Sequence, residues 1–172
     1  MVWLPILQSL WFIFPAYASN ALPILIRGRH PIDFGAHLGK QRLLGDGKTI
    51  EGALGGIIFG ILIGWLQMSG HSQLPSELGL AKFTMELIVL LSIGAILGDI
   101  AGAFIKRRLG IARGYPAPLL DQLDFLVGAL IAASAVIEVS KPMAIVLLIV
   151  TPMIHMATNR VSFWLKMKKV PW

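Results

Sequence analysis

The stretch FTMELIVLLSIGAILGDIAGAFI, residues 83–105, decides the fold class. Its only charged residues are Glu86 and Asp99. A bilayer's hydrocarbon core is roughly 30 Å thick and takes about 20 apolar residues to cross, so this stretch predicts a transmembrane helix. The composition agrees: 56% of the 172 residues are hydrophobic, 14% are charged, and the mean hydropathy is +0.75. Soluble domains usually carry about 25% charged residues, so lipid must solvate much of this chain.

Four further apolar stretches complete a prediction of five spans. The five cover about 2–26, 51–69, 83–105, 119–138 and 143–164, with loops 27–50 and 106–118 on one side. Ala16-Tyr17-Ala18 is similar to a signal cleavage site, but no Lys or Arg precedes the first apolar run, so we expect a retained span. The fold class is therefore an all-α integral membrane protein, a bundle forming a single domain over residues 1–172.

The basic residues set the orientation. Thirteen of the fifteen Lys and Arg fall on one side of the five-span arrangement, and only Lys82 and Lys141 fall on the other. Positively charged loops stay in the cytoplasm, which places the N-terminus outside the cell membrane and the C-terminus inside. The net charge of +6 would suggest nucleic acid binding in a soluble protein, but here span-flanking residues explain it. No nucleic acid partner is expected.

Glycines recur every four residues in the second and third spans. They are Gly52, Gly56, Gly60 and Gly64, followed by Gly94, Gly98 and Gly102. Small residues at this spacing form a flat stripe on which helix backbones approach closely. The stripes predict close packing of the second and third spans or, alternatively, a homodimer.

Three carboxylates, Asp99, Asp121 and Asp124, lie in or beside the third and fourth spans. Charges at such positions are costly and often functional. Alternatively, Asp99 forms a salt bridge to a neighbouring helix, and Asp121 and Asp124, which share a helix face, favour a helix N-terminus. Together the three are typical of a magnesium site, because Mg²⁺ takes oxygen ligands and commonly combines one or two carboxylates with substrate phosphates.

Cations follow the third span closely. They are Lys106, Arg107, Arg108 and Arg113. Some could simply anchor the helix end in the cytoplasm. A carboxylate–metal centre ringed by Lys and Arg nevertheless suits a polyphosphate, because the metal bridges some oxygens and the cations hold the others.

A glycine-rich segment leads into the second span. It reads Gly45-Asp46-Gly47-Lys48-Thr49-Ile50-Glu51-Gly52. A Walker A loop would need Gly at position 42, which is Arg, so that interpretation fails. Backbone amides, Lys48 and a helix N-terminus could still bind an anion.

Five motifs in order resemble the archaeal CDP-archaeol synthase family. They are Ser19-Asn20-Ala21-Leu22-Pro23, Gly28 to Gly35 (GRHPIDFG), Gly45 to Gly52 (GDGKTIEG), Gly98 to Arg108 (GDIAGAFIKRR) and Asp121 to Phe125 (DQLDF). The last two are also distantly similar to the phosphatidate cytidylyltransferase signature. That signature's His-Gly-Gly segment and Lys-Asp pair do not appear here, so no cytidine-base contact is carried over.

The resemblance implies a CTP-dependent cytidylyltransferase of membrane phospholipid biosynthesis. Its expected reaction joins CTP to 2,3-bis-O-geranylgeranylglycerol 1-phosphate, with Mg²⁺, giving the CDP-lipid and pyrophosphate. Asp99, Asp121 and Asp124 would be metal ligands and, with Lys106, catalytic. Contacts to CTP and its phosphates would come from Gly45, Asp46, Gly47, Lys48, Thr49, Arg107, Arg108 and Arg113. Asn20, Pro23 and Asp33 belong to motifs with a lipid-binding or structural role.

Two other classes stay open at this point. A transferase using a polyprenyl phosphate and a nucleotide-sugar also employs Asp and Mg²⁺ at the membrane interface. A small transporter could use Asp99 as an ion relay, although that role favours acids near the midplane, whereas the three acids here cluster toward one face.

Overall fold

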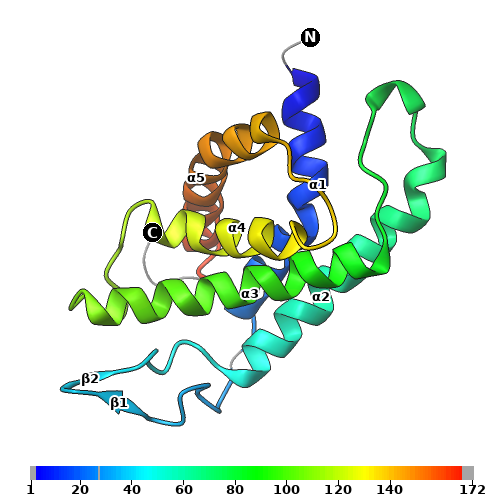
Figure 1. Ribbon diagram of the computed structural model, residues 1–172. Helices are drawn as coiled ribbons and strands as arrows, with labels where there is room; N and C mark the ends of the chain where they lie inside the picture. Colours follow the sequence, from blue (N-terminus) through cyan, green and yellow to red (C-terminus); the bar gives the residue numbers. More distant parts are fainter. Residues whose placement is uncertain (1–2, 27, 168–172) are drawn as a thin grey trace.

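The computed structural model describes residues 3–26 and 28–167, which fold into helices and one small hairpin (Figure 1). The main helices are α1 (Trp3–Ala21), α2 (Ile50–Gly70), α3 (Met85–Arg108), α4 (Leu120–Ala133) and α5 (Lys141–Trp164). Short 3-10 helices are η1 (Leu22–Ile24), η2 (His71–Gln73) and η3 (Ser76–Leu78). Position 2 of the first predicted span and three of the counted basic residues, Arg27, Lys168 and Lys169, lie outside the described residues.

Hydroxyl side chains start three of the long helices. Thr49, Thr84 and Ser140 are the N-cap residues of α2, α3 and α5, and each hydroxyl oxygen accepts a hydrogen bond from a backbone N–H three residues ahead. Such caps satisfy amides that have no partner inside the helix. The last turn of α3 carries Lys106, Arg107 and Arg108, whose charges suit a helix C-terminus.

Three helices among the described residues are long and apolar enough to cross a membrane: α2 continued by η2, α3 and α5, each of 24 residues. At 1.5 Å per residue each is about 36 Å long. Helix α4 has 14 residues and ends at Ala133, short of the predicted 138, because the chain turns at Ser134. Helix α1 is not one of these three helices, and it carries the polar side chains of Gln8, Ser9 and Asn20. The all-helical membrane fold is confirmed, while the number of five spans and their orientation stay predictions.

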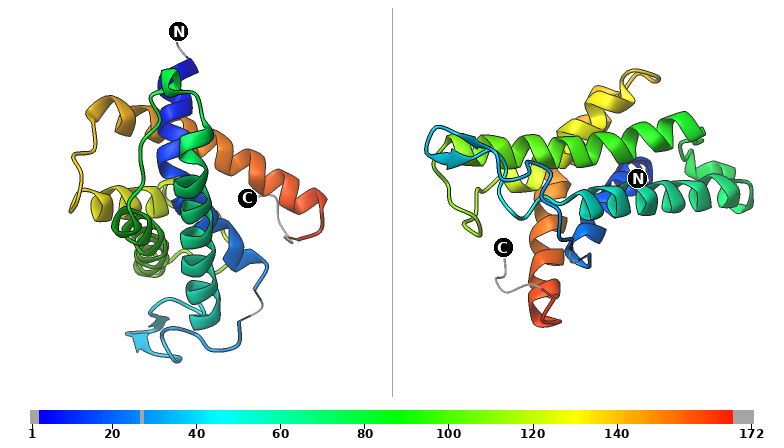
Figure 2. Two further views of the ribbon diagram at one scale, coloured as in Figure 1. Left: turned by 90° about the vertical axis from the view of Figure 1, so that its right-hand side faces the viewer. Right: turned by 90° about the horizontal axis from the view of Figure 1, so that it is seen from below.

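The glycine stripes pack within the chain. A Cβ on Gly60 would meet Ser19 Oγ and the Pro15 carbonyl of α1, so α1 and α2 are in backbone contact there. On α3, Gly94 faces the Gly128 carbonyl of α4 in the same way. Figure 1 and the right view of Figure 2 show α3 and α4 lying side by side. The stripes therefore pack within the chain, but not simply against each other as predicted: the stripe of α2 faces α1 and α3, and the stripe of α3 faces α4. The homodimer has no support from the stripes.

The loop between α1 and α2 contains a hairpin that the sequence patterns did not predict. Strand β1 (His37–Leu38) pairs antiparallel with β2 (Gln41–Arg42), with His37 opposite Arg42. Arg108, at the end of α3, donates hydrogen bonds to the carbonyls of Leu38 (3.0 Å) and Arg42 (2.8 Å). These bonds fix the hairpin beside the C-terminal end of α3, and the glycine-rich segment follows directly.

Candidate active site

Two adjoining cavities lie where the glycine-rich segment meets α3. The larger, of about 250 Å³, has a wall of apolar side chains from η1, α2 and α3, including Pro23 and Ile96. The smaller, of about 170 Å³, is lined mainly by charged side chains. Four residues line both cavities: Gly47, Lys48, Asp99 and Arg113.

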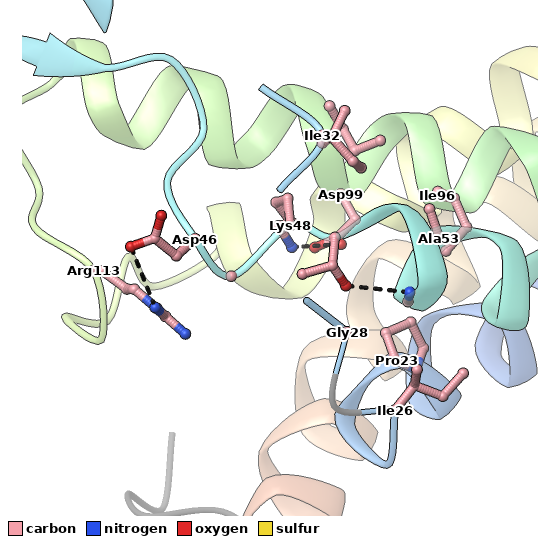
Figure 3. A pocket seen from close by; sticks show the side chains of 14 residues that line it. Pro23, Ile26, Gly28, Ile32, Asp46, Lys48, Ala53, Ile96, Asp99 and Arg113 are labelled. Atoms are coloured by element: carbon pink, nitrogen blue, oxygen red, sulfur yellow. Dashed lines mark hydrogen bonds and ion pairs between the residues drawn. The ribbon is translucent and has the colours of Figure 1, made fainter. Parts of the chain in front are cut away.

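An ion pair stands where the two cavities meet. Lys48 Nζ, from the loop before α2, donates a hydrogen bond of 2.5 Å to Asp99 Oδ2 on α3 (Figure 3). Both side chains are about one quarter exposed, so a ligand in either cavity can reach them. Asp99 thus does form a salt bridge, but its partner lies in the glycine-rich loop and not on a neighbouring helix.

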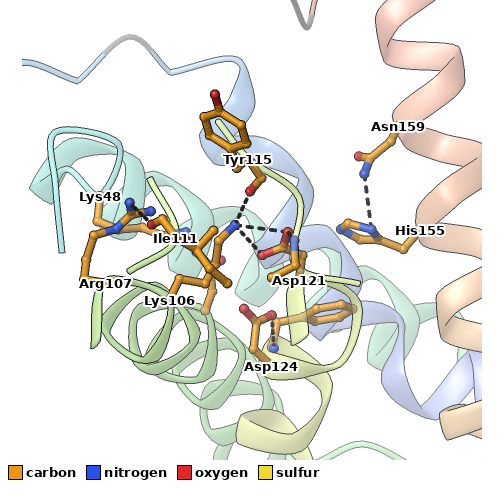
Figure 4. A network of polar contacts seen from close by, with 12 residues as sticks. Lys48, Lys106, Arg107, Ile111, Tyr115, Asp121, Asp124, His155 and Asn159 are labelled. Carbon is orange, nitrogen blue, oxygen red and sulfur yellow. Dashed lines mark hydrogen bonds and ion pairs between the residues drawn. The ribbon is translucent and has the colours of Figure 1, made fainter. Parts of the chain in front are cut away.

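A second Lys–Asp pair lies in the smaller cavity (Figure 4). Lys106 Nζ contacts both oxygens of Asp121, at 2.8 and 3.1 Å, and also donates to the Tyr115 carbonyl at 3.0 Å. Asp121 Oδ2 accepts the Ala117 N–H at 2.8 Å, one turn before it. The helix N-terminus alternative for Asp121 is therefore also real, but its carboxylate lines the cavity as well.

Asp124 completes the group of three carboxylates in the smaller cavity. It lies against Gly102 of α3, where any Cβ would collide with the Asp124 carboxylate. Its Oδ1 accepts the Phe125 N–H at 2.7 Å, and no cation among the described residues forms an ion pair with it. Gly102 thus lets α4 approach closely enough for Asp124 to face Asp99.

The three arginines after Lys106 have different positions relative to the two cavities. Arg107 lines the smaller cavity and donates to the Ile111 carbonyl at 2.5 Å, while its buried Nε has no partner among the described residues. Arg113 lines both cavities and lies 4.0 Å from Asp46. Arg108 lines neither, since it holds the hairpin and stacks on Phe104 at 5.3 Å. Arg108 is thus placed as a structural residue.

The glycine-rich segment contributes a wall rather than a closed phosphate loop. Asp46, Gly47 and Thr49 line the larger cavity beside Lys48. Gly45 lines neither cavity; it has a φ of +89°, the left-handed conformation that glycine adopts most readily. The segment therefore turns at Gly45 and then runs along the cavity into α2.

Asn20, Pro23 and Asp33 have separate positions. Pro23 lines the larger cavity, while Asn20, at the end of α1, is half-buried and lines neither. Asp33 is buried behind the glycine-rich segment. The Arg42 guanidinium and three backbone amides hold the pKa of the Asp33 carboxyl well below its usual range.

The donor set suits Mg²⁺, because three carboxylates line one cavity and carboxylate oxygen is its preferred protein ligand. Two of the three are bound to lysines, and no group of three His, Asp or Glu among the described residues is close enough to hold a metal ion. An all-protein cage is therefore absent from this part of the chain. The site therefore suits an ion that takes its remaining ligands from the substrate phosphates, as Mg²⁺ usually does.

Sequence reasoning gave no role to Glu51. Its carboxylate accepts the backbone N–H groups of Arg29 and His30, both at 3.2 Å, and contacts His30 Nδ1 at 2.6 Å. Gly28, beside this contact, lines the larger cavity. Glu51 thus ties the chain after η1 to the start of α2. An acidic residue in the first turn of a helix was the available signal, but it is too common to indicate a partner.

Fold and site together define a membrane-embedded helical protein with a charged site at one end of its helices. The family model described as CarS-like CDP-archaeol synthase matches residues 2–172. The CDP-archaeol synthase of Pyrococcus abyssi is 43% identical over 169 residues, covering 98% of this chain and 99% of the relative. That of Thermococcus gammatolerans is 46% identical over 165 residues, 95% of each chain.

A solved structure gives the same result. It is described as an intramembrane enzyme for archaeal membrane lipids biosynthesis, and it matches with a TM-score of 0.76 and 40% identity, over 90% of this chain and 94% of the other. The chain belongs to the CDP-archaeol synthase family. The predicted family and the predicted enzyme class, nucleotidyltransferase, are confirmed. The nucleotide-sugar transferase and the transporter find no support in these comparisons.

Proposed function

We propose that this chain transfers the cytidylyl group of CTP to 2,3-bis-O-geranylgeranylglycerol 1-phosphate, releasing pyrophosphate. The observation that carries the proposal is the pair of cavities joined at Lys48 and Asp99: the smaller is lined mainly by charged side chains, and the larger combines apolar side chains with charged ones. The smaller cavity suits a charged nucleotide, and the larger suits a lipid phosphate. The similarity to CDP-archaeol synthases supports the same reaction.

The reaction needs positioning more than acid–base chemistry. The acceptor phosphate is anionic at neutral pH, so one of its oxygens attacks the α-phosphorus of CTP without prior deprotonation. A new P–O bond forms, the bond between the α-phosphorus and the α–β bridging oxygen breaks, and pyrophosphate leaves. Holding the two phosphates together and offsetting their charge accounts for catalysis.

The cations of the smaller cavity suit the triphosphate. Lys106, Arg107 and Arg113 line it with Lys48, so four positive side chains face one space. Lys48 also lines the larger cavity, so its ammonium group lies at the junction of the two cavities. We assign Lys48 to the phosphates of CTP.

Asp99, Asp121 and Asp124 would hold Mg²⁺, which supplies charge neutralisation for the phosphate oxygens. Asp99 and Asp121 keep Lys48 and Lys106 at the cavity wall until substrate phosphates offer those lysines other partners. The half-buried position of Asp124 against Gly102 limits the water around its carboxylate.

Membrane placement follows from the substrates. The isoprenoid chains stay in the bilayer while CTP arrives from the cytoplasm, so we place the charged end at the cytoplasmic face of the cell membrane, in accord with the basic loops.

Donor and acceptor substitution tests the proposal. Purified protein with Mg²⁺ should convert the geranylgeranyl lipid phosphate and CTP to a CDP-lipid, identified by its mass. A nucleotide-sugar donor or a polyprenyl phosphate acceptor should give no product. Product formed only with a nucleotide-sugar would contradict the proposed reaction.

A further inference from the structure

The carboxylate of Asp33 accepts five hydrogen bonds from the protein, which a role in contacting lipid would not require. Its side chain is 1% exposed. Oδ1 accepts from the Gly35 N–H (3.1 Å) and Arg42 Nη2 (2.7 Å), and Oδ2 accepts from Arg42 Nε (3.3 Å), the Leu44 N–H (3.0 Å) and the Gly45 N–H (3.1 Å). Buried carboxylates persist when charge and hydrogen bonds compensate them, and here both do.

Hydrogen bonds from Asp33 and from its neighbour Ile32 hold the two ends of the segment Gly45–Lys48. Asp33 binds the amides at its start, and the N–H of the neighbouring Ile32 donates to the Lys48 carbonyl at 2.8 Å. Gly47 and Lys48 line both cavities, whereas Asp33 lines neither. A shift of the Asp33 carboxylate would therefore move Lys48 relative to Asp99 without removing any side chain that lines the cavities.

A second connection runs through Arg42. Its guanidinium also contacts Asp46 at 2.8 Å, and Asp46 lies 4.0 Å from Arg113 in the same cavity wall. Its carbonyl accepts from Arg108 at the end of α3. The buried Asp33–Arg42 pair thus joins the hairpin, the glycine-rich segment and α3.

We infer that Asp33 is a positioning residue, whose carboxylate fixes the segment Gly45–Lys48 so that Lys48 stands between the two cavities to meet the phosphates of CTP. The inference rests on the proposed function, because it states what the segment is positioned for. The depressed pKa of Asp33 fits this role, since the carboxylate stays ionised and able to accept all five bonds well into the acid range.

The test variant is Asp33→Asn, whose amide has similar shape but no charge and turns an NH₂ group toward the donors around it. We expect the KM for CTP to rise by roughly 10- to 100-fold, since small misplacements of this kind cost about that much. The KM for the lipid phosphate should stay within about twofold. Hydrogen exchange should accelerate at residues 44–48 and not in α3–α4.

Two further variants make the result decisive. Asp33→Glu keeps the charge but moves the carboxylate by one methylene, and it should show the same selective loss for CTP while melting near the wild-type temperature. Glu77→Gln removes an exposed carboxylate in η3, between α2 and α3, and should change nothing.

The outcomes separate this inference from the proposed function. Wild-type protein that binds no CTP contradicts the proposed function itself. If the wild type binds CTP and both Asp33 variants bind it equally tightly, or if both variants lose the fold, Asp33 is merely structural and the inference is overturned. A selective rise in the KM for CTP with faster exchange at 44–48 supports it.

Discussion

Lys48 donates a 2.5 Å hydrogen bond to Asp99, which lies 51 residues further along the chain, and this pair marks the junction of the smaller cavity with the larger one. One partner lies on a glycine-rich loop and the other on a long apolar helix. Hydrogen bonds among Asp33, Arg42 and Arg108 connect this loop to the end of α3. The pair is the natural place to perturb the site.

Lys48→Ala should weaken the use of CTP by about 10- to 150-fold. A charged contact to phosphate contributes roughly 1.5–3 kcal/mol, which corresponds to that range. Steady-state constants for both substrates measure the effect, and the KM for the lipid should be nearly unchanged. A defect confined to the lipid would place Lys48 on the acceptor phosphate instead.

Asp121→Asn and Asp124→Asn should each abolish turnover, that is, lower kcat by more than about 100-fold. Changes in residues that merely orient metal ligands already cost about 10- to 100-fold, so loss of a ligand's charge should cost at least as much. The variants should insert into membranes and elute as folded protein in detergent. If either variant is active at the Mg²⁺ concentration used for the wild type, the substituted residue is only a charge at the helix end and not a metal ligand.

Gly98→Ala should separate α3 from α4. A Cβ there would collide with the Asp124 carbonyl and lie 3.1 Å from Gly128 Cα. Overpacking of this kind typically costs about 1–3 kcal/mol, and here it also displaces a site carboxylate. Thermal unfolding in detergent should show a lower melting temperature, with reduced activity. The matched control is Gly70→Ala, which meets no atom within 4 Å; equal melting temperatures for the two variants would contradict the packing.

Topology is open to a direct test with tags. A tag after the C-terminus should be cytoplasmic and one near Ser72, between α2 and α3, external, because thirteen of the fifteen basic residues fall on one side of the five-span arrangement. Accessibility to a membrane-impermeant reagent reads out both positions. Protection of both tags on the same side would contradict the five-span arrangement.

The long helices could be predicted because each is a continuous apolar run: the predicted spans 83–105 and 143–164 match α3 and α5 to within three residues at each end. The break after Ala133 could not, since Ser134 and the apolar residues after it read as a continuing span. The hairpin was also missed, because two-residue strands carry no period.

Sequence reasoning named most residues that line the cavities, since Asp, Lys and Arg near spans are costly and thus informative. It could not pair Lys48 with Asp99 or Lys106 with Asp121, because pairing depends on how the loops are placed. It placed Asp33 in a motif without a partner, and only the structure shows that Arg42 and the Gly45 amide are what it binds.

The most direct test of the proposed reaction is to follow two phosphate labels of CTP separately. Purified protein receives the geranylgeranyl lipid phosphate, Mg²⁺, and CTP labelled at either the α- or the γ-phosphate. We expect the α-label to move into the organic phase as CDP-lipid and the γ-label to appear only in pyrophosphate, in equal amounts. Absence of α-label from the lipid, or transfer of γ-label to it, would contradict cytidylyl transfer.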